Sequence, residues 1–233
     1  MLRSLVGSEM CIRDSNTTAS NNTAVGKNSM FANTTGADNS ALGAFTLDAN
    51  TTGYNNVAVG KSALGANTEG FSNTALGLNS LDANTTGDHN TAVGMGSLTA
   101  NTTAGDNTAV GHSALEATTT GFSNTAVGKN AGVAITTGDE NVAIGMNAGI
   151  NLTTGNHNIL IGHGPTTSQV DSERQIVIGR DVVGNGGDHL TFGDGSTDSA
   201  IQFGATSISA PSDVRLKEDI QDETVGLLSL IHI

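Results

Sequence analysis

Asn107-Thr108-Ala109-Val110-Gly111 is followed 17 residues later by Asn124-Thr125-Ala126-Val127-Gly128, and this pentapeptide recurs along most of the chain. No residue is inserted between successive copies, and a period kept this strictly predicts identical stacked units. We number each unit from its asparagine, so that Asn22 is position 1 and Asp38 is position 17. The ten copies begin at Asn22, Asn39, Asn56, Asn73, Asn90, Asn107, Asn124, Asn141, Asn158 and, more weakly, Gln175.

Three positions of the unit predict a strand. Position 5 is glycine in all ten copies, which indicates a backbone with positive φ or a close approach between units. Position 4 is always Val, Leu or Ile, and we expect it to face the core. Position 3 is alanine in eight copies and then Leu160 and Val177. A constant small residue beside a constant large one predicts two packed strand faces, one of them tight.

The rest of the unit predicts a second core contact and two turns. Position 9 is usually leucine, and Asn-Thr-Thr-Gly segments such as residues 50–53 carry turn chemistry. Each unit should therefore hold one short strand, one partial strand and two turns. We expect an all-β fold, a β-solenoid or β-roll of 17-residue coils about 4.8 Å apart, and thus a rod of roughly 50 Å. The position-1 asparagines should form an amide ladder up one edge, unless they act only as turn residues.

The composition of the 233 residues agrees with a thin, elongated structure. There are 31 glycines and 2 prolines, and aromatic residues make up 3% of the chain, so a wide core is not expected. The net charge of −13 and the lack of a basic cluster argue against nucleic-acid binding. No apolar run is long enough to predict a membrane span. The histidines show no ligand spacing, so we expect no metal and no cofactor.

A roll this slim has a core only a few side chains wide. Sharing a core between chains would remedy this, and the position-3 alanines would allow a close approach. We therefore expect a homotrimer.

The repeat Asn-(Ser/Thr/Val)-Ala-(Val/Leu/Ile)-Gly-x-x-Ala resembles the head repeats of trimeric autotransporter adhesins, and it is similar to repeats in the shafts of phage tail fibres. The resemblance covers residues 16–180 and implies a left-handed parallel β-roll in a homotrimer. The adhesin repeat is typically shorter than 17 residues, so the details of its coil are not carried over.

Residues 211–220 combine several charged side chains with residues that favour the start of a helix. Ser212 lies five residues before Lys217, a spacing that allows either a nucleophile and its base or simply a helix capped by Ser212 or Asp213. The stretch resembles the start of the self-cleaving C-terminal chaperone of phage tail spikes and endosialidases, whose signature is Ser-Asp-x-Arg-x-Lys. That resemblance implies cleavage between Ser212 and Asp213, with Ser212 as nucleophile, Lys217 as base and Arg215 as the remaining fixed position.

We divide the chain accordingly. Residues 16–180 form the repeat shaft, 181–211 an irregular β segment at a neck or tip, and 212–227 the beginning of the chaperone and of a helix. Residues 1–15 and 228–233 do not fit the repeat and resemble translated sequencing adapter. The chaperone family's domain is much longer than the residues after Ser212, so we expect no self-cleavage by this chain as given.

These patterns predict a structural attachment fibre, like a virion tail fibre, whose chaperone assists trimerisation and then cleaves itself off. Its partners would be further copies of itself and a polysaccharide or receptor on the host cell surface. It would be located in a virion tail, outside the cell or on its surface. A bacterial trimeric adhesin head is the alternative. An ice-binding solenoid is a minor one, because the common threonine pair, such as Thr34-Thr35, is adjacent and would send its hydroxyls to opposite faces.

Overall fold

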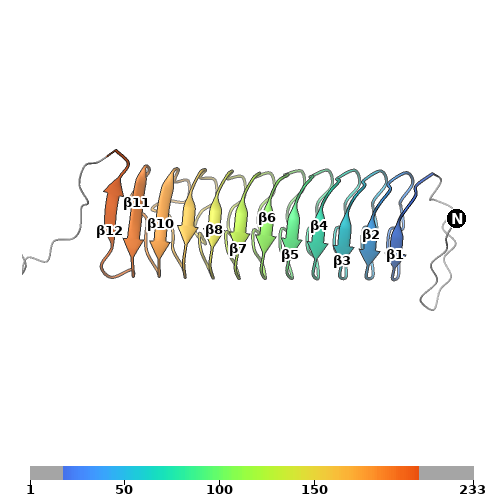
Figure 1. Ribbon diagram of the computed structural model, residues 1–233, viewed down its shortest axis with the longest axis horizontal. Helices are drawn as coiled ribbons and strands as arrows, with labels where there is room; N and C mark the ends of the chain where they lie inside the picture. The colour runs from blue at the N-terminus through green and yellow to red at the C-terminus, as the bar shows by residue number, and fades with distance from the viewer. Residues whose placement is uncertain (1–17, 205–233) are drawn as a thin grey trace, which may run out of the picture.

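Each 17-residue unit forms one short strand and then turns back to begin the next unit beside it. The computed structural model describes residues 18–204, and these form an all-β parallel solenoid, which confirms the predicted fold class (Figure 1). No helix occurs among these residues. The strands are β1 (Thr23–Val25), β2 (Ser40–Leu42), β3 (Val57–Val59), β4 (Thr74–Leu76), β5 (Thr91–Val93), β6 (Thr108–Val110), β7 (Thr125–Val127), β8 (Val142–Ile144), β9 (Ile159–Ile161), β10 (Gln175–Gly179), β11 (His189–Gly193) and β12 (Ser199–Gln202).

The twelve strands form one sheet in chain order, so every strand pairs with its sequence neighbours. From β1 to β10 the register advances by one repeat per strand, as in Ala109 opposite Ala126. The next step is shorter, because Gln175 pairs with His189. The register break after Gly179 is thus a short coil that still stacks in parallel. β12 then reverses and pairs antiparallel with β11.

The sheet faces the core through position 3, not position 4. Ala58, Ala75 and Ala109 are fully buried, whereas Leu42 and Leu76 at position 4 are 52% and 47% exposed. The expectation that position 4 is the inward site was therefore wrong. Because side chains alternate along a strand, the inward side chain at position 3 sends positions 2 and 4 outward, and an alanine at position 3 leaves room for the leucine across the coil. The buried alanines also cannot provide the close approach between chains that we expected of them.

The core's other wall is built from position 9, as predicted. Leu47, Leu64 and Leu81 are fully buried. Their backbone is not a strand, however, because position 9 has φ between 48° and 54° from Met30 to Leu115, and position 7 is also left-handed. This wall still bonds to the next coil, as Leu64 N–H does to the Ser80 carbonyl at 3.0 Å. The predicted partial strand is thus a left-handed turn, which a period of identical residues cannot distinguish from a strand.

The glycine at position 5 has both a positive φ and a close approach to the next coil, as predicted. From Gly26 to Gly179 its φ lies between 123° and 145°, where side chains are strongly disfavoured. A Cβ at Gly111 would also overlap the carbonyl oxygen of Gly128 in the next coil. The glycine column therefore sets how closely the coils stack.

The position-1 asparagines form the predicted ladder, but inside the rod and mainly with the backbone. The side-chain Oδ1 of Asn56 accepts the backbone N–H of Asn73 at 2.9 Å, and Asn73 Nδ2 donates to the Gly87 carbonyl at 2.8 Å. Equivalent Oδ1 bonds run from Asn22 to Gln175. Asn73 is fully buried, so this column is an interior spine, and the expectation of an edge ladder is corrected.

A second amide column lies at position 12. Asn67 Nδ2 donates to Asn50 Oδ1 at 2.8 Å and to the carbonyl of Gly70 at 3.0 Å, and the same side-chain bond links Asn33 through Asn101. The column stops at Thr118, whose hydroxyl bonds the Ile135 carbonyl instead. Asn101 Oδ1 therefore has no hydrogen-bond partner within residues 18–204.

Where the second amide column ends, the core exchanges large and small positions. Position 9 becomes glycine at Gly132 and Gly149, while position 12 becomes Ile135 and Leu152, both fully buried. A Cβ on Gly132 would lie 2.9 Å from Leu115 Cδ2 and 3.0 Å from Ile135 Cδ1. Bulk has thus moved from position 9 to position 12, and the neighbouring side chains fill the space that a leucine at position 9 would take.

A methyl group at the position-5 glycine should destabilise the rod. We expect Gly111→Ala to cost at least about 2 kcal/mol, because a strained φ is added to a backbone clash. The matched control is Gly96→Asn at position 7. Gly96 has φ of 69°, and the same position in another coil holds Asn79 with φ of 54°, so an asparagine is tolerated there. Urea unfolding followed by circular dichroism measures both, and equal midpoints would contradict the stacking role of Gly111.

The exchange of bulk predicts energetic coupling between positions 9 and 12. Leu115→Gly alone opens a cavity, and Thr118→Ile alone overfills the core. Together they reproduce the pattern of Gly132 and Ile135. We expect the double variant to be more stable than the sum of the single changes by about 1 kcal/mol or more. A double-mutant cycle from urea unfolding tests this, and additive effects would contradict it.

Candidate functional site

The residues predicted to carry the self-cleavage lie outside the described part of the chain. Ser212, Asp213, Arg215 and Lys217, with the predicted helix start, all follow residue 204. Residues 18–204 contain no group of three or more His, Cys, Asp or Glu side chains placed to hold a metal ion. They also contain no helix long and apolar enough to cross a membrane. The described residues instead offer two surfaces that run the length of the rod.

The first surface, which we call the sheet face, consists of the outward side chains at positions 2 and 4 of β1–β11, with Ser199 and Ile201 of β12. It follows directly from the inward turn of position 3. None of these side chains carries a charge. In the middle of the rod, position 2 is threonine, and the hydroxyls of Thr91, Thr108 and Thr125 have no hydrogen-bond partner among the described residues.

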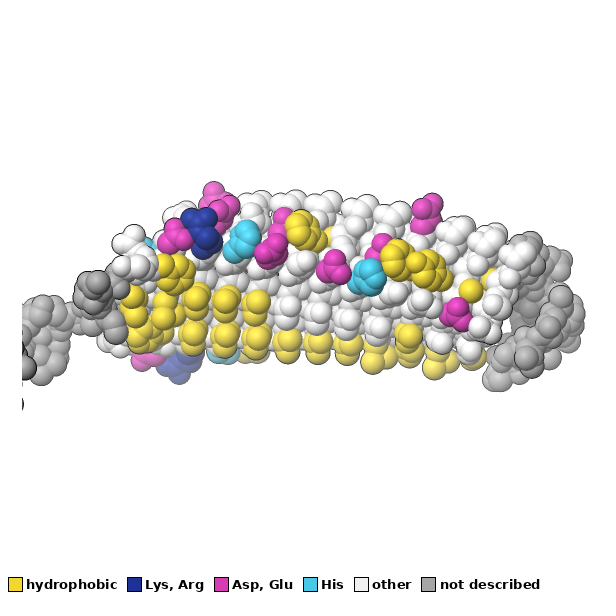
Figure 2. Space-filling view, turned by 45° about the horizontal axis from the view of Figure 1, so that its top comes forward, with side chains coloured by type: hydrophobic (Ala, Val, Ile, Leu, Met, Phe, Trp, Pro, Cys, Tyr) yellow, Lys and Arg dark blue, Asp and Glu magenta, His cyan; other side chains and the backbone are white. Residues whose placement is uncertain are grey.

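Position 4 is apolar along the whole rod, and towards the C-terminal end position 2 becomes apolar as well. Strand pairing places β8, β9, β10, β11 and β12 side by side. Figure 2 shows hydrophobic side chains gathered over these coils at the left. We call this area the apolar patch, and it consists of Val142, Ile144, Ile159, Ile161, Ile176, Ile178, Leu190, Phe192 and Ile201.

The second surface, the turn edge, consists of positions 16 and 17, where aromatic, acidic and histidine side chains form a line along the rod (Figure 2). The rings of Tyr54 and Phe71 stack with centroids 4.8 Å apart and planes within 2°. Phe71 also meets His89 edge to face at 5.0 Å. The Tyr54–Phe71 stack follows from the repeat, which places equivalent position-16 side chains one coil apart, whereas Phe71 meets His89 at position 17 of the next coil.

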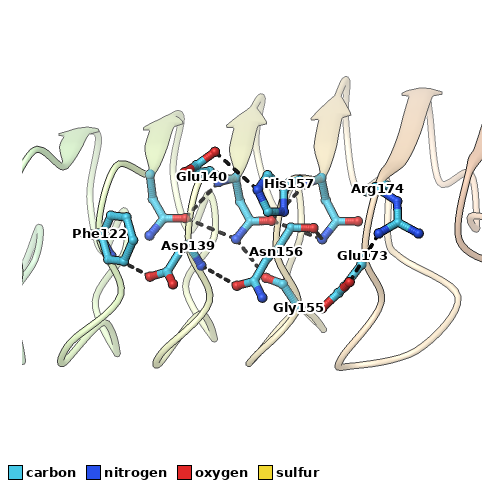
Figure 3. A network of polar contacts seen from close by, with 11 residues as sticks. Phe122, Asp139, Glu140, Gly155, Asn156, His157, Glu173 and Arg174 are labelled. Atoms are coloured by element: carbon cyan, nitrogen blue, oxygen red, sulfur yellow. Dashed lines mark hydrogen bonds and ion pairs between the residues drawn. The ribbon is translucent and has the colours of Figure 1, made fainter.

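Polar side chains of the turn edge bond mainly to neighbouring coils (Figure 3). Asp139 Oδ1 accepts the Phe122 backbone N–H at 2.9 Å, and Asn156 Oδ1 accepts the Asp139 N–H at 2.7 Å. His157 lies 3.3 Å from Glu140 in an exposed pair. One carboxylate oxygen of Asp139 is thus occupied by a backbone donor from the preceding coil.

The threonine pair of the Asn-Thr-Thr turn does not form a flat double array. Position 13 is half-buried, and its hydroxyl bonds along the rod, as Thr51 Oγ1 does to the Thr68 carbonyl at 3.0 Å. Thr52 at position 14 is exposed. The first hydroxyl of each pair is thus used inside the rod rather than offered to a surface.

Charge pairing is strongest beside the short coil. The Arg174 guanidinium donates to both oxygens of Asp188, at 2.6 and 2.9 Å, and this bond lowers the pKa of the Asp188 carboxyl. Nearby, hydrogen bonds from the Ser196 hydroxyl, the Ser196 backbone and the Thr197 backbone lower the pKa of Asp194 to about 2. In mid-rod, partial burial raises the pKa of Asp82.

Sequence reasoning missed the sheet face because it treated the large residue at position 4 as buried. The signal that could have found it is the constancy of the small residue beside it, since alanine fits the narrow core between the strand and the leucine at position 9. No protein-family model, curated protein or solved structure matches the chain.

The pairing of Arg174 with Asp188 can be tested by titration. Because the Asp188 pKa is lowered, the ion pair stabilises the folded state at pH values above the ordinary aspartate pKa. This stabilisation is lost as the pH falls through the lowered pKa. We expect Arg174→Gln to raise the Asp188 pKa towards its ordinary range while the Asp194 pKa stays near 2. Carboxyl NMR titration measures both, and an unchanged Asp188 value would contradict the assigned cause.

Proposed function

We propose that this chain is the shaft of a homotrimeric attachment fibre, like a virion tail fibre, which displays a binding end to a cell surface. The observation that carries the proposal is the unbranched rod of in-register coils, which holds its two ends apart with buried ladders of hydrogen bonds (Figure 1). Such a structure is suited to spacing and display. Its partners would be its own copies and a host surface polysaccharide or receptor, and it would act in a virion tail or outside the cell.

The proposal includes a maturation step. The segment from Ser212 would begin an intramolecular chaperone that assists trimerisation, after which the bond between Ser212 and Asp213 is cut. Ser212 would be the nucleophile, Lys217 its base and Arg215 a supporting residue. The support for this step is the Ser-Asp-x-Arg-x-Lys pattern on the C-terminal side of a β-repeat shaft.

The test uses the full-length protein encoded by the intact gene, expressed as wild type and as Ser212→Ala and Lys217→Arg variants. Mass spectrometry should find a cut after Ser212 in the wild type only, because alanine removes the nucleophile and arginine cannot act as a base. Ser209→Ala is the matched control and should be cut normally. An uncut wild type would remove the self-cleaving step and favour a bacterial adhesin head instead.

A further inference from the structure

We infer that the sheet face, and above all its apolar patch, is the surface through which copies of this chain pack against one another. The inference rests on the homotrimer proposed above and names its interface. It also replaces the alanine contact expected from the sequence, since those alanines are buried within each coil.

The patch is exposed in the single chain and has no covering element among the described residues. Ile144, Ile161 and Ile178 are 38%, 36% and 41% exposed, and Phe192 is 38% exposed. They are successive members of one column, since each strand pairs in register with the next. A contiguous apolar surface of this kind marks an interaction site, because leaving it in water is unfavourable.

The distribution of charge supports a protein contact at this face. The chain has a net charge of −13, yet no charged side chain lies on the sheet face from β1 to β12. Acidic residues lie instead on the turn edge, as Asp106, Asp139 and Glu140 do. Depletion of charge is characteristic of the buried centre of an interface. The turn edge would then remain exposed to solvent.

A second copy of the chain fits this surface because it has the same period. Strands recur about every 4.8 Å, so a parallel copy at the same level presents an aliphatic side chain to each aliphatic side chain of the first. Three copies around an axis along the rod would close this head-to-tail contact into a ring.

The size of the surface is sufficient. Twelve strands at about 4.8 Å give a face roughly 55 Å long. A strip about 10 Å wide gives roughly 550 Å² per copy, shared between its two neighbours in the ring, which is of the order of the ~800 Å² per partner of a standard interface.

The experiment measures molar mass by sedimentation equilibrium on the full-length protein encoded by the intact gene, over a wide range of protein concentration. We expect the wild type to form a trimer and Ile144→Glu/Ile161→Glu/Ile178→Glu to dissociate at least about 100-fold more readily, because three carboxylates would be buried. The matched control is Thr120→Glu/Thr137→Glu/Thr154→Glu, which adds equal charge to exposed position 14 of three coils. This control should remain a trimer.

A milder variant guards against loss of the fold. Val142→Thr/Ile159→Thr/Ile176→Thr gives β8–β10 the position-2 residue that β4–β7 already have, so the coils should form normally. We expect it to weaken association about 10-fold or more through lost apolar contact.

The outcomes separate this inference from the proposed function. A wild-type trimer that both sheet-face variants leave intact would overturn the interface while the homotrimer stands. A wild type that stays monomeric would overturn both the interface and the homotrimer, and the Ser212 experiment would still decide the chaperone. If that monomer also showed thermal hysteresis that the glutamates remove, the sheet face would be an ice-binding surface instead.

Discussion

The bond from each position-1 asparagine to the backbone of the next coil is the constraint on which the rest of the rod depends. Asn73 Oδ1 accepts the backbone N–H of Asn90 in the next coil, and Asn73 Nδ2 closes its own coil onto the Gly87 carbonyl. Both polar ends of a buried amide are thus satisfied, and leaving either unpaired would be costly. One extra residue between Asn73 and Gly87 would change the spacing to both partners, which agrees with the 17-residue spacing kept from Asn22 to Gln175.

At the core positions 9, 12 and 3, side-chain size and backbone strain vary together from coil to coil. Leucine at position 9 adopts a left-handed backbone that large side chains normally avoid. Burial of the side chain across from alanine offsets this strain. Where Gly132 relieves the strain, Ile135 at position 12 supplies bulk to the core instead. The core is therefore kept filled by different positions in different coils, and Leu160 at position 3 packs against Gly149 in the same way.

The sequence predicted the solenoid well because period is a property of residue identity alone. The 17-residue coil, the glycine column, the buried leucines and the existence of an asparagine ladder could all be inferred. Orientation could not, because a three-residue strand is too short for alternation to identify its inner side, and size was then mistaken for burial at Val59 and Leu76. The left-handed turn at Leu64 was missed for a related reason. A strand and a left-handed turn can both repeat once per coil and bond to the next coil, so the residue period alone does not distinguish them. The sheet face was hidden by the first of these errors, and Ser212 and Lys217 lie outside the described residues.

The antiparallel β12 has a consequence for how the rod can grow. Every other strand offers its neighbour a parallel edge that an identical coil could extend, whereas β12 presents Ser199–Gln202 in the opposite direction. A second rod placed end to end here could not continue the parallel register or the asparagine spine. Sheet edges that invite such addition lead to uncontrolled filaments. The reversed strand therefore interrupts the parallel register, and identical coils cannot be stacked directly onto β12.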